Sequence, residues 1–313
     1  MTENLSTLIT EAVNERSRDL DRLSVLEMVR IINDEDKKVA SAVEAELEHI
    51  AQAIEIIAEA LRKGGHLIYL GAGTSGRLGV LDAVECPPTF GLAPEIIRGV
   101  LAGGERAMFR SAEDVEDDEM QGAADLRREG ITSADVIVGI AASGRTPYTI
   151  GGLKEARRRG CKTVAITNNP GSPMTALADV AITPVVGPEV LAGSTRMKAG
   201  TSQKIVLNMI STGVMVRLGK VYSNLMVDVR PTNGKLVERA KRIIREVTGL
   251  DRARVEGLWV EADQETRTAI VMALADCSAA EAREALARHG GRVREAVEER
   301  RGQPAASGLR RPS

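Results

Sequence analysis

Residues 66–76 read HLIYLGAGTSG, a short apolar run followed by a turn of glycine and hydroxyl residues. Residues 66–70 have the length and apolar character of a buried strand, and residues 78–85 have the pattern of a helix. A strand that passes through such a turn into a helix is typical of the parallel sheets of α/β proteins. The stretch therefore predicts the first strand and helix of such a sheet.

The same alternation recurs along the middle of the chain. Four further strands are expected at residues 95–102, 136–141, 163–167 and 180–184. Helices are expected between them, one from an N-cap at Ser111 to about residue 130, and a long one at about 201–218. The helix at 78–85 should stop at Pro87-Pro88. Strands that alternate with helices form right-handed βαβ units, so the sequence predicts an α/β fold with a parallel sheet.

Both ends of the chain are expected to be helical. Apolar residues recur at helical spacing from Ser24 to the polar run at 33–36, and again over 39–61. Three short helices are expected after residue 248, and the last residues are rich in Gly, Pro, Ser and Arg. We therefore expect an N-terminal helical segment (1–60), a central α/β domain (61–240), a helical bundle (241–300) and a disordered tail (301–313).

The composition argues against several classes of protein. The 313 residues carry a net charge of −2 and only two Phe, three Tyr and one Trp, which argues against binding nucleic acid by bulk charge or by stacking. The three Cys and three His residues are far apart, so neither a disulfide framework nor a metal site is expected. We see no secretory signal and no apolar run of about 18 residues, so we expect a cytoplasmic protein.

The small net charge hides an uneven distribution. Residues 1–60 hold 14 acidic and 6 basic side chains, residues 61–240 hold 18 and 22, and residues 241–313 hold 12 and 14. The three segments therefore carry net charges of −8, +4 and +2. The acidic first segment excludes a basic DNA-binding arm at this end of the chain.

Two strand-to-helix junctions, GTSGR at 73–77 and SGRT at 143–146, have the residue types of a phosphate site. Glycine lets the backbone approach a ligand closely, hydroxyls donate hydrogen bonds, and a helix N-terminus attracts an anion. The alternative is that these residues only make turns. The glycines at 71, 73 and 76 also match the dinucleotide fingerprint, but the second strand does not end in the acid that would hold a ribose.

Two carboxylates lie at contrasting ends of the expected helices. Glu85 is placed at a helix C-terminus, where the dipole should raise the pKa of its carboxyl group, and Glu116 in a first turn, where the dipole favours the anion. Such a contrast is typical of a general acid paired with a general base. The alternative for Glu116 is a solvated acid in a cluster of acids at a helix start.

A third stretch, residues 189–201, combines hydroxyls and cations beside Glu189. Arg196 and Lys198 lie close to Ser194 and either contact an anionic ligand or are solvated charges.

The middle of the chain resembles a sugar isomerase (SIS) domain, and longer motifs make the resemblance more specific. Over about residues 5–300, the chain resembles the N-acetylmuramic acid 6-phosphate etherase family. The motifs that carry it are LEMVRIINDEDKKV (26–39), LIYLGAGTSGRLGVLDAVECPPTFG (67–91), GIAASGRTPYTIGGL (139–153), GPEVLAGSTRMKAGTSQK (187–204) and NLMVDVRPTN (224–233). The resemblance implies a three-layer αβα sandwich with a five-stranded parallel sheet, N-terminal helices and a C-terminal bundle like a ubiquitin-associated domain.

The resemblance also implies an activity. Members of this family cleave the D-lactyl ether at C3 of N-acetylmuramic acid 6-phosphate by elimination and then hydration, without a metal or redox cofactor. Glu85 would be the acid that assists departure of the lactyl oxygen, and Glu116 the base that removes the C2 proton. The run of acids also permits a register in which Glu113 is the base.

The remaining site residues follow from the same resemblance. Ser75, Ser143 and Thr146 would hold the 6-phosphate, and Glu189 would line the sugar site. The other expected binding residues are Gly73, Thr74, Gly144, Arg145 and Ser194. A homodimer is also implied, and the composition predicts that it binds neither nucleic acid nor membrane. Two other functions use the same loops: a phosphosugar isomerase with Glu189 as base, and a non-enzymatic sugar-phosphate sensor resembling the glucokinase regulatory protein.

Overall fold

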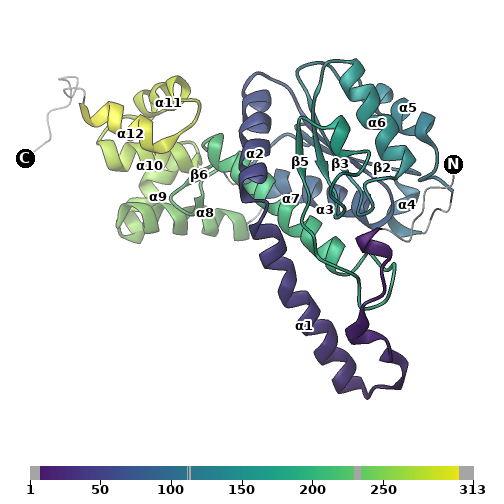
Figure 1. The fold of residues 1–313 in the computed structure, drawn as a ribbon. Coiled ribbons are helices and arrows are strands. Elements are labelled where there is room, and N and C mark those ends of the chain that lie inside the picture. Colours follow the sequence, from purple (N-terminus) through teal and green to yellow (C-terminus); the bar gives the residue numbers. More distant parts are fainter. Residues whose placement is uncertain (1–7, 111, 113, 229–233, 303–313) are drawn as a thin grey trace, which may run out of the picture. The chain divides into compact units, whose positions relative to one another are not determined.

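The computed structural model describes residues 8–110, 112, 114–228 and 234–302. The chain divides into two compact units: unit 1 comprises Met1–Cys86 and Ala93–Val214, and unit 2 comprises Pro87–Leu92 and Met215–Ser313. Unit 1 holds the sheet and unit 2 holds a group of helices (Figure 1). Within the described ranges, no helix is both long and apolar enough to cross a membrane.

A five-stranded parallel sheet forms the centre of unit 1, as predicted. Its strands lie in the order β2-β1-β3-β4-β5. Their bounds are β1 (Leu67–Gly71), β2 (Ile97–Leu101), β3 (Val136–Ile140), β4 (Lys162–Ile166) and β5 (Val180–Ile182). Every residue of β1 and β3 is buried, which explains why both strands are continuous apolar runs rather than alternating ones.

Helices cover both faces of the sheet, and this confirms the three-layer architecture. Leu70 of β1 packs with Leu153 of α6 on one face, where α5 lies beside α6. On the other face the hydroxyl of Tyr69 donates to Asp82 of α3 at 2.9 Å, and Asn208 of α7 donates to the same carboxylate at 2.7 Å. Successive strand residues point to opposite faces, so α5 and α6 form one layer and α3 and α7 belong to the other. The helices after residue 46 that begin in this unit are α2 (Leu47–Arg62), α3 (Gly73–Phe90), α4 (Arg106–Phe109), α5 (Glu119–Arg128), α6 (Pro147–Arg158), the 3-10 turn η5 (Thr175–Leu177) and α7 (Lys198–Arg217). The last residues of α3 and α7 belong to unit 2.

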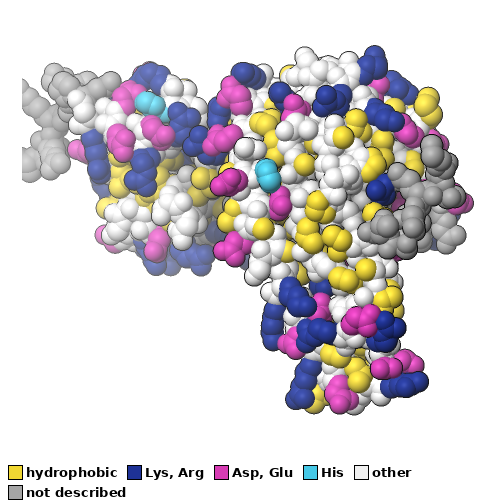
Figure 2. Space-filling view, in the orientation of Figure 1, with side chains coloured by type: hydrophobic (Ala, Val, Ile, Leu, Met, Phe, Trp, Pro, Cys, Tyr) yellow, Lys and Arg dark blue, Asp and Glu magenta, His cyan; other side chains and the backbone are white. Residues whose placement is uncertain are grey.

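The N-terminal segment is helical as predicted, but the break between its helices lies at residues 45–46 and not at the predicted 33–36. Three 3-10 turns, η2 (Ile9–Glu11), η3 (Glu15–Ser17) and η4 (Leu20–Arg22), precede a single helix, α1 (Val25–Glu44). The polar run at 33–36 was expected to end a helix but lies inside α1, which starts with a capping box at Ser24. Helix α1 extends away from the sheet, and charges of both signs cover this part of unit 1 (Figures 1 and 2).

A buried ion pair explains why α1 tolerates the polar run. Lys198 Nζ donates to Glu35 Oε2 at 2.7 Å, and both side chains are almost completely buried. Arg16 and Lys38 donate to the other carboxylate oxygen of Glu35 at 2.9 and 2.6 Å. Burial alone would raise the pKa of Glu35, but the hydrogen bonds from these three cations outweigh it and lower the pKa to about 2. Lys198 is therefore neither a solvated charge nor free to bind a ligand.

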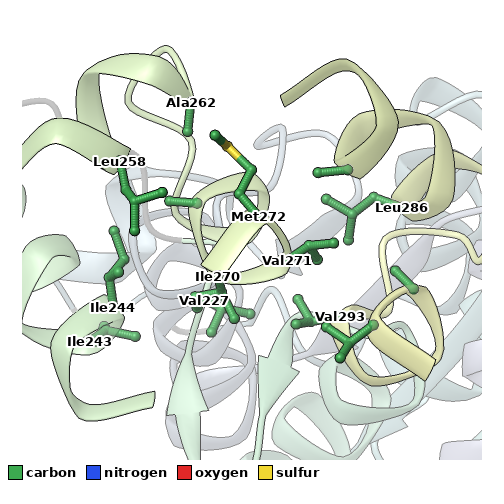
Figure 3. Close-up of a cluster of buried hydrophobic side chains, with 14 of the residues drawn as sticks. Val227, Ile243, Ile244, Leu258, Ala262, Ile270, Val271, Met272, Leu286 and Val293 are labelled. Atoms are coloured by element: carbon green, nitrogen blue, oxygen red, sulfur yellow. The ribbon is translucent and has the colours of Figure 1, made fainter. Parts of the chain in front are cut away.

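Unit 2 is a helical bundle with its own core. It contains the short strands β6 (Val221–Tyr222) and β7 (Leu225–Met226), and the helices α8 (Gly234–Thr248), α9 (Arg252–Glu261), α10 (Thr266–Ala275), α11 (Ala279–Arg288) and α12 (Val293–Gly302). The expectation of three short helices after residue 248 was wrong, because Asp263 and Gln264 adopt positive φ and divide the first of them into α9 and α10. Trp259 is buried in the bundle core as expected, and Figure 3 shows other members of that core, including Ile244, Ile270 and Leu286.

The predicted division at residues 60, 240 and 300 stays a prediction. Helix α8 begins before residue 240 and contributes Ala240, Ile243 and Ile244 to the core of unit 2. Most of the tail predicted to be disordered, residues 303–313, lies outside the described part of the chain.

Replacing Glu35 with Gln is expected to destabilise the protein by about 3 kcal/mol at neutral pH, because it leaves Lys198 buried and charged without its carboxylate. The folded-state pKa of Glu35 is depressed, so its contribution is complete above about pH 4.5 and is lost as the pH falls towards 2. Urea denaturation followed by circular dichroism should therefore give a larger difference between wild type and Glu35→Gln at about pH 7 than at about pH 3.

Glu44→Gln is the matched control, since Glu44 is exposed at the end of the same helix and has no ion pair among the described residues. It should change the free energy of unfolding by less than about 0.5 kcal/mol. A loss for Glu35→Gln that is the same at both pH values would contradict the role given to the pair.

Candidate active site

The two loops rich in glycine and hydroxyl residues meet at one edge of the sheet. β1 and β3 are parallel neighbours, with Gly71 opposite Ile140 at their ends. The chain passes from these ends into α3, which begins at Gly73, and α6, which begins at Pro147. Both helix N-termini therefore lie at the carboxyl edge of the sheet, where open α/β sheets bind ligands.

The first loop forms the first turn of α3. Gly73 is exposed with a φ of +53°, and Thr74 and Ser75 are half-buried. The turn is tight, because a Cβ atom at Gly76 would lie 2.4 Å from the carbonyl oxygen of Gly71. The first N–H groups of a helix have no partner within the helix, so this turn can offer backbone donors and two hydroxyls to an anion.

The second loop turns sharply before α6. Gly144 has a φ of +67°, and a Cβ atom there would lie 2.1 Å from Ser172 Oγ. Ser143 Oγ accepts a hydrogen bond from the N–H of Arg145 at 3.2 Å. Thr146 is the N-cap residue of α6, but its hydroxyl makes no capping hydrogen bond. The Thr146 hydroxyl therefore does not cap α6 and can donate a hydrogen bond to a ligand.

Two buried hydroxyls beside this loop were not predicted. Ser172 Oγ and Thr149 Oγ1 have no hydrogen-bond partner within the described part of the chain, although both residues are buried. Buried polar groups are rarely left unpaired. The only sequence signal for Ser172 was its place in a turn after β4, because its contact with Gly144 depends on the pairing of two strands.

The position of Glu85 differs from the prediction. Helix α3 does not stop before Pro87-Pro88 but continues to Phe90, and the N–H of Gly91 closes the last turn on Pro87 at 2.9 Å. The two prolines remove N–H donors to carbonyls one turn earlier, but their fixed φ suits a helix. Glu85 is exposed inside the helix rather than at its end. The predicted placement of Glu85 at a helix C-terminus was therefore wrong.

The position of Glu116 also differs from the prediction. Helix α5 begins at Glu119 and is capped by Asp118, whose carboxylate accepts from the N–H of Gln121 at 2.9 Å. Glu116 lies in the turn before this cap and is exposed. Its carbonyl oxygen accepts a hydrogen bond from the N–H of Tyr148 at 3.0 Å. This bond holds the Glu116 turn beside the start of α6, next to the second loop.

Two residues that bear on the choice of base lie outside the described part of the chain. These are Ser111, the predicted N-cap, and Glu113, the other candidate for the base.

Glu189 is buried and caps α7. Its two carboxylate oxygens accept from the N–H groups of Lys198 and Ala199 at 3.0 and 2.9 Å. Burial raises the pKa of Glu189, and these two backbone hydrogen bonds and the charge of Lys198 act in the opposite direction. Ser194 is half-buried in the turn that leads into α7, and its carbonyl accepts from the N–H of Met197 at 3.2 Å.

Cys86 follows Glu85 but is unsuited to nucleophilic chemistry. Burial, together with the nearby charge of Asp82, raises the pKa of its thiol to about 12. The thiolate is the reactive form of cysteine, so almost none is present near neutral pH.

Comparisons with known proteins identify domains and structures to which this chain is similar. The glucokinase regulatory protein N-terminal SIS domain matches residues 49–157, and the SIS domain matches residues 118–212. A solved phosphoheptose isomerase from Neisseria gonorrhoeae superposes with a TM-score of 0.47 at 20% identity, covering 61% of this chain and 98% of that one.

Two relatives match along nearly their whole length. An N-acetylmuramic acid 6-phosphate etherase from Symbiobacterium thermophilum is 59% identical and covers 87% of this chain and 90% of its own. A protein of the same name from Clostridium botulinum (strain Langeland) is 53% identical and covers 95% and 98%. The chain belongs to the N-acetylmuramic acid 6-phosphate etherase family.

Proposed function

We propose that this protein is a lyase that cleaves the D-lactyl ether of N-acetylmuramic acid 6-phosphate. Its products are N-acetylglucosamine 6-phosphate and D-lactate, in the recycling of peptidoglycan sugars. The observation that carries the proposal is identity above 50% to etherases over almost the whole of both chains. The two loops at one edge of the sheet support it, because they suit a phosphorylated sugar.

The reaction needs one acid and one base. In the open-chain sugar the C1 aldehyde acidifies the C2 proton, which the base removes while the C3–O bond breaks and the acid protonates the departing lactyl oxygen. Water then adds to C3 of the α,β-unsaturated intermediate, the two carboxyl groups exchange roles, and C2 regains a proton. The net change is the addition of one water, so neither a metal nor a redox cofactor enters the balance.

We propose Glu85 as the acid and Glu116 as the base. The role of Glu116 as the base is supported by the position of its turn, which is hydrogen-bonded to the start of α6. Glu189 is less suited to take the C2 proton, because both of its oxygens already accept backbone hydrogen bonds. This same contact pattern disfavours the isomerase alternative, in which Glu189 is the base.

The 6-phosphate is proposed to bind between the N-termini of α3 and α6. Ser75, Ser143 and Thr146 would donate hydroxyl hydrogen bonds, and the Thr146 hydroxyl does not cap its own helix. The glycines of both loops would let the ligand approach the backbone. The other proposed lining residues are Gly73, Thr74, Gly144, Arg145, Glu189 and Ser194.

The match to the glucokinase regulatory protein supports a second candidate, a sugar-phosphate sensor without catalytic activity. A homodimer in the cytoplasm fits either function and remains part of the proposal.

The purified protein should release D-lactate from N-acetylmuramic acid 6-phosphate, measured with a D-lactate dehydrogenase assay. The reaction should leave N-acetylglucosamine 6-phosphate in equal amount. Binding of the substrate without lactate release would support the sensor and overturn the lyase.

Glu85→Gln and Glu116→Gln should each lower kcat by at least roughly 100-fold, the usual contribution of a general acid or base. Glu95→Gln, at an exposed carboxylate away from both loops, serves as the control and should keep the wild-type rate. A near-wild-type rate for Glu116→Gln would move the base to Glu113 or Glu189.

Ser143→Ala should raise KM by roughly tenfold with a smaller effect on kcat, because it removes one hydrogen bond to a charged phosphate. Ser133→Ala changes an exposed serine just before β3, at the opposite edge of the sheet, and should leave KM unchanged. An unchanged KM for Ser143→Ala would exclude Ser143 from the phosphate site.

A further inference from the structure

Unit 2 has a hollow of about 570 Å³ between α8 and α9 that the proposed reaction does not use. This volume is within the range of small-molecule sites. Eight charged side chains line it, six of them basic: Lys235, Arg239, Lys241, Arg242, Arg245 and Arg252. Figure 2 shows Lys and Arg side chains gathered along the lower edge of this unit, over α8 and α9.

Most of these cations have no carboxylate partner. Lys241 Nζ lies 2.6 Å from Glu256 Oε2 and 3.9 Å from Glu238 Oε1. Both acids that line the hollow therefore form ion pairs with Lys241. The other five basic residues are exposed and form no ion pair with any residue that the structure describes. The hollow therefore keeps an excess of positive charge that the protein itself does not neutralise.

Several of these cations are placed unfavourably for the helices that carry them, although Arg245, in the last turn of α8, is placed favourably. Lys235, Arg239, Arg242 and Arg245 follow one another at spacings of four, three and three residues, so like charges are neighbours on one face of α8. Arg252 is the first residue of α9, where the helix dipole disfavours a cation, and the first turn of α9 contains no acid. The N-cap Asp251 is the acid at this end of α9, and the helix ends account for Arg245 but not for the row of like charges along α8. That row points to a ligand as the reason for the charges.

We propose that this hollow binds a small metabolite carrying at least two phosphate groups. Arginine forms paired hydrogen bonds with phosphate oxygens, and several arginines along one helix face match several phosphates. No aromatic residue lines the hollow, so it lacks the stacking platform of a site for single-stranded nucleic acid. All its lining residues belong to unit 2, and none is a proposed active-site residue, so this site does not depend on the proposed lyase activity.

Tripolyphosphate is a suitable probe, titrated into the full-length protein by isothermal calorimetry at constant ionic strength. The double variant Arg239→Gln/Arg242→Gln should weaken binding by at least roughly tenfold, because each change removes a charge-assisted contact. Glutamine preserves helix propensity, so circular dichroism should show an unchanged fold. The KM for N-acetylmuramic acid 6-phosphate should also stay unchanged.

Arg254→Gln is the matched control, since Arg254 is exposed on α9 but does not line the hollow. It should leave tripolyphosphate affinity within about twofold of wild type. Ser143→Ala should retain the binding too, which separates the hollow from the proposed phosphate site of unit 1.

Three results would overturn the proposal. The first is an unchanged affinity in the double variant, and the second is an equal loss in Arg254→Gln, which would indicate bulk charge. The third is tighter, arginine-dependent binding of a single-stranded DNA oligonucleotide, of anionic vesicles or of a second copy of the chain, which would assign this surface to a macromolecule.

Discussion

The pairing of β1 with β3 is the constraint on which the candidate active site depends. Because the two strands are parallel and in register from Leu67 to Gly71, the helices that follow them start at the same edge. Each helix N-terminus carries a partial positive charge, so two of them at one edge suit the single anion proposed to bind there. A slip of one residue would exchange the buried faces of β1, so the core that fixes the register also fixes the site.

A second constraint fixes the position of the start of α7 within unit 1. Lys198 is bound twice, through its backbone N–H to Glu189 and through its ammonium group to Glu35. A buried ion pair adds little net stability, but a buried charge without its partner is costly, so such pairs act mainly on geometry. The cap and the ion pair together restrict the conformation of residues 189–197 where they join α7.

Local patterns predicted the strands well and the helix ends poorly. Short runs rich in apolar residues predicted all five strands, and complete burial makes the runs of β1 and β3 the clearest. The end of α3 was missed because Pro87-Pro88 can lie within a last helical turn, and the start of α5 because several residues before it, Asp118 among them, can serve as a cap. Glu35 and Lys198 are 163 residues apart, and Ser172 meets Gly144 only through the fold, so no local pattern could reveal either contact.

Net charge also proved too coarse a measure of anion binding. Charges in water are screened beyond about 10 Å, so a ligand responds to its neighbours and not to the sum over the chain. The phosphate site proposed at the sheet edge consists mainly of neutral groups, namely hydroxyls and helix N-termini, which add nothing to the net charge. The cations of α8 and Arg252 are offset in the total by acids of α1 and α2, although Lys241 is the only one of the six that pairs with a carboxylate among the described residues. A chain with a net charge of −2 can therefore hold two separate places suited to anions, built on different chemistry.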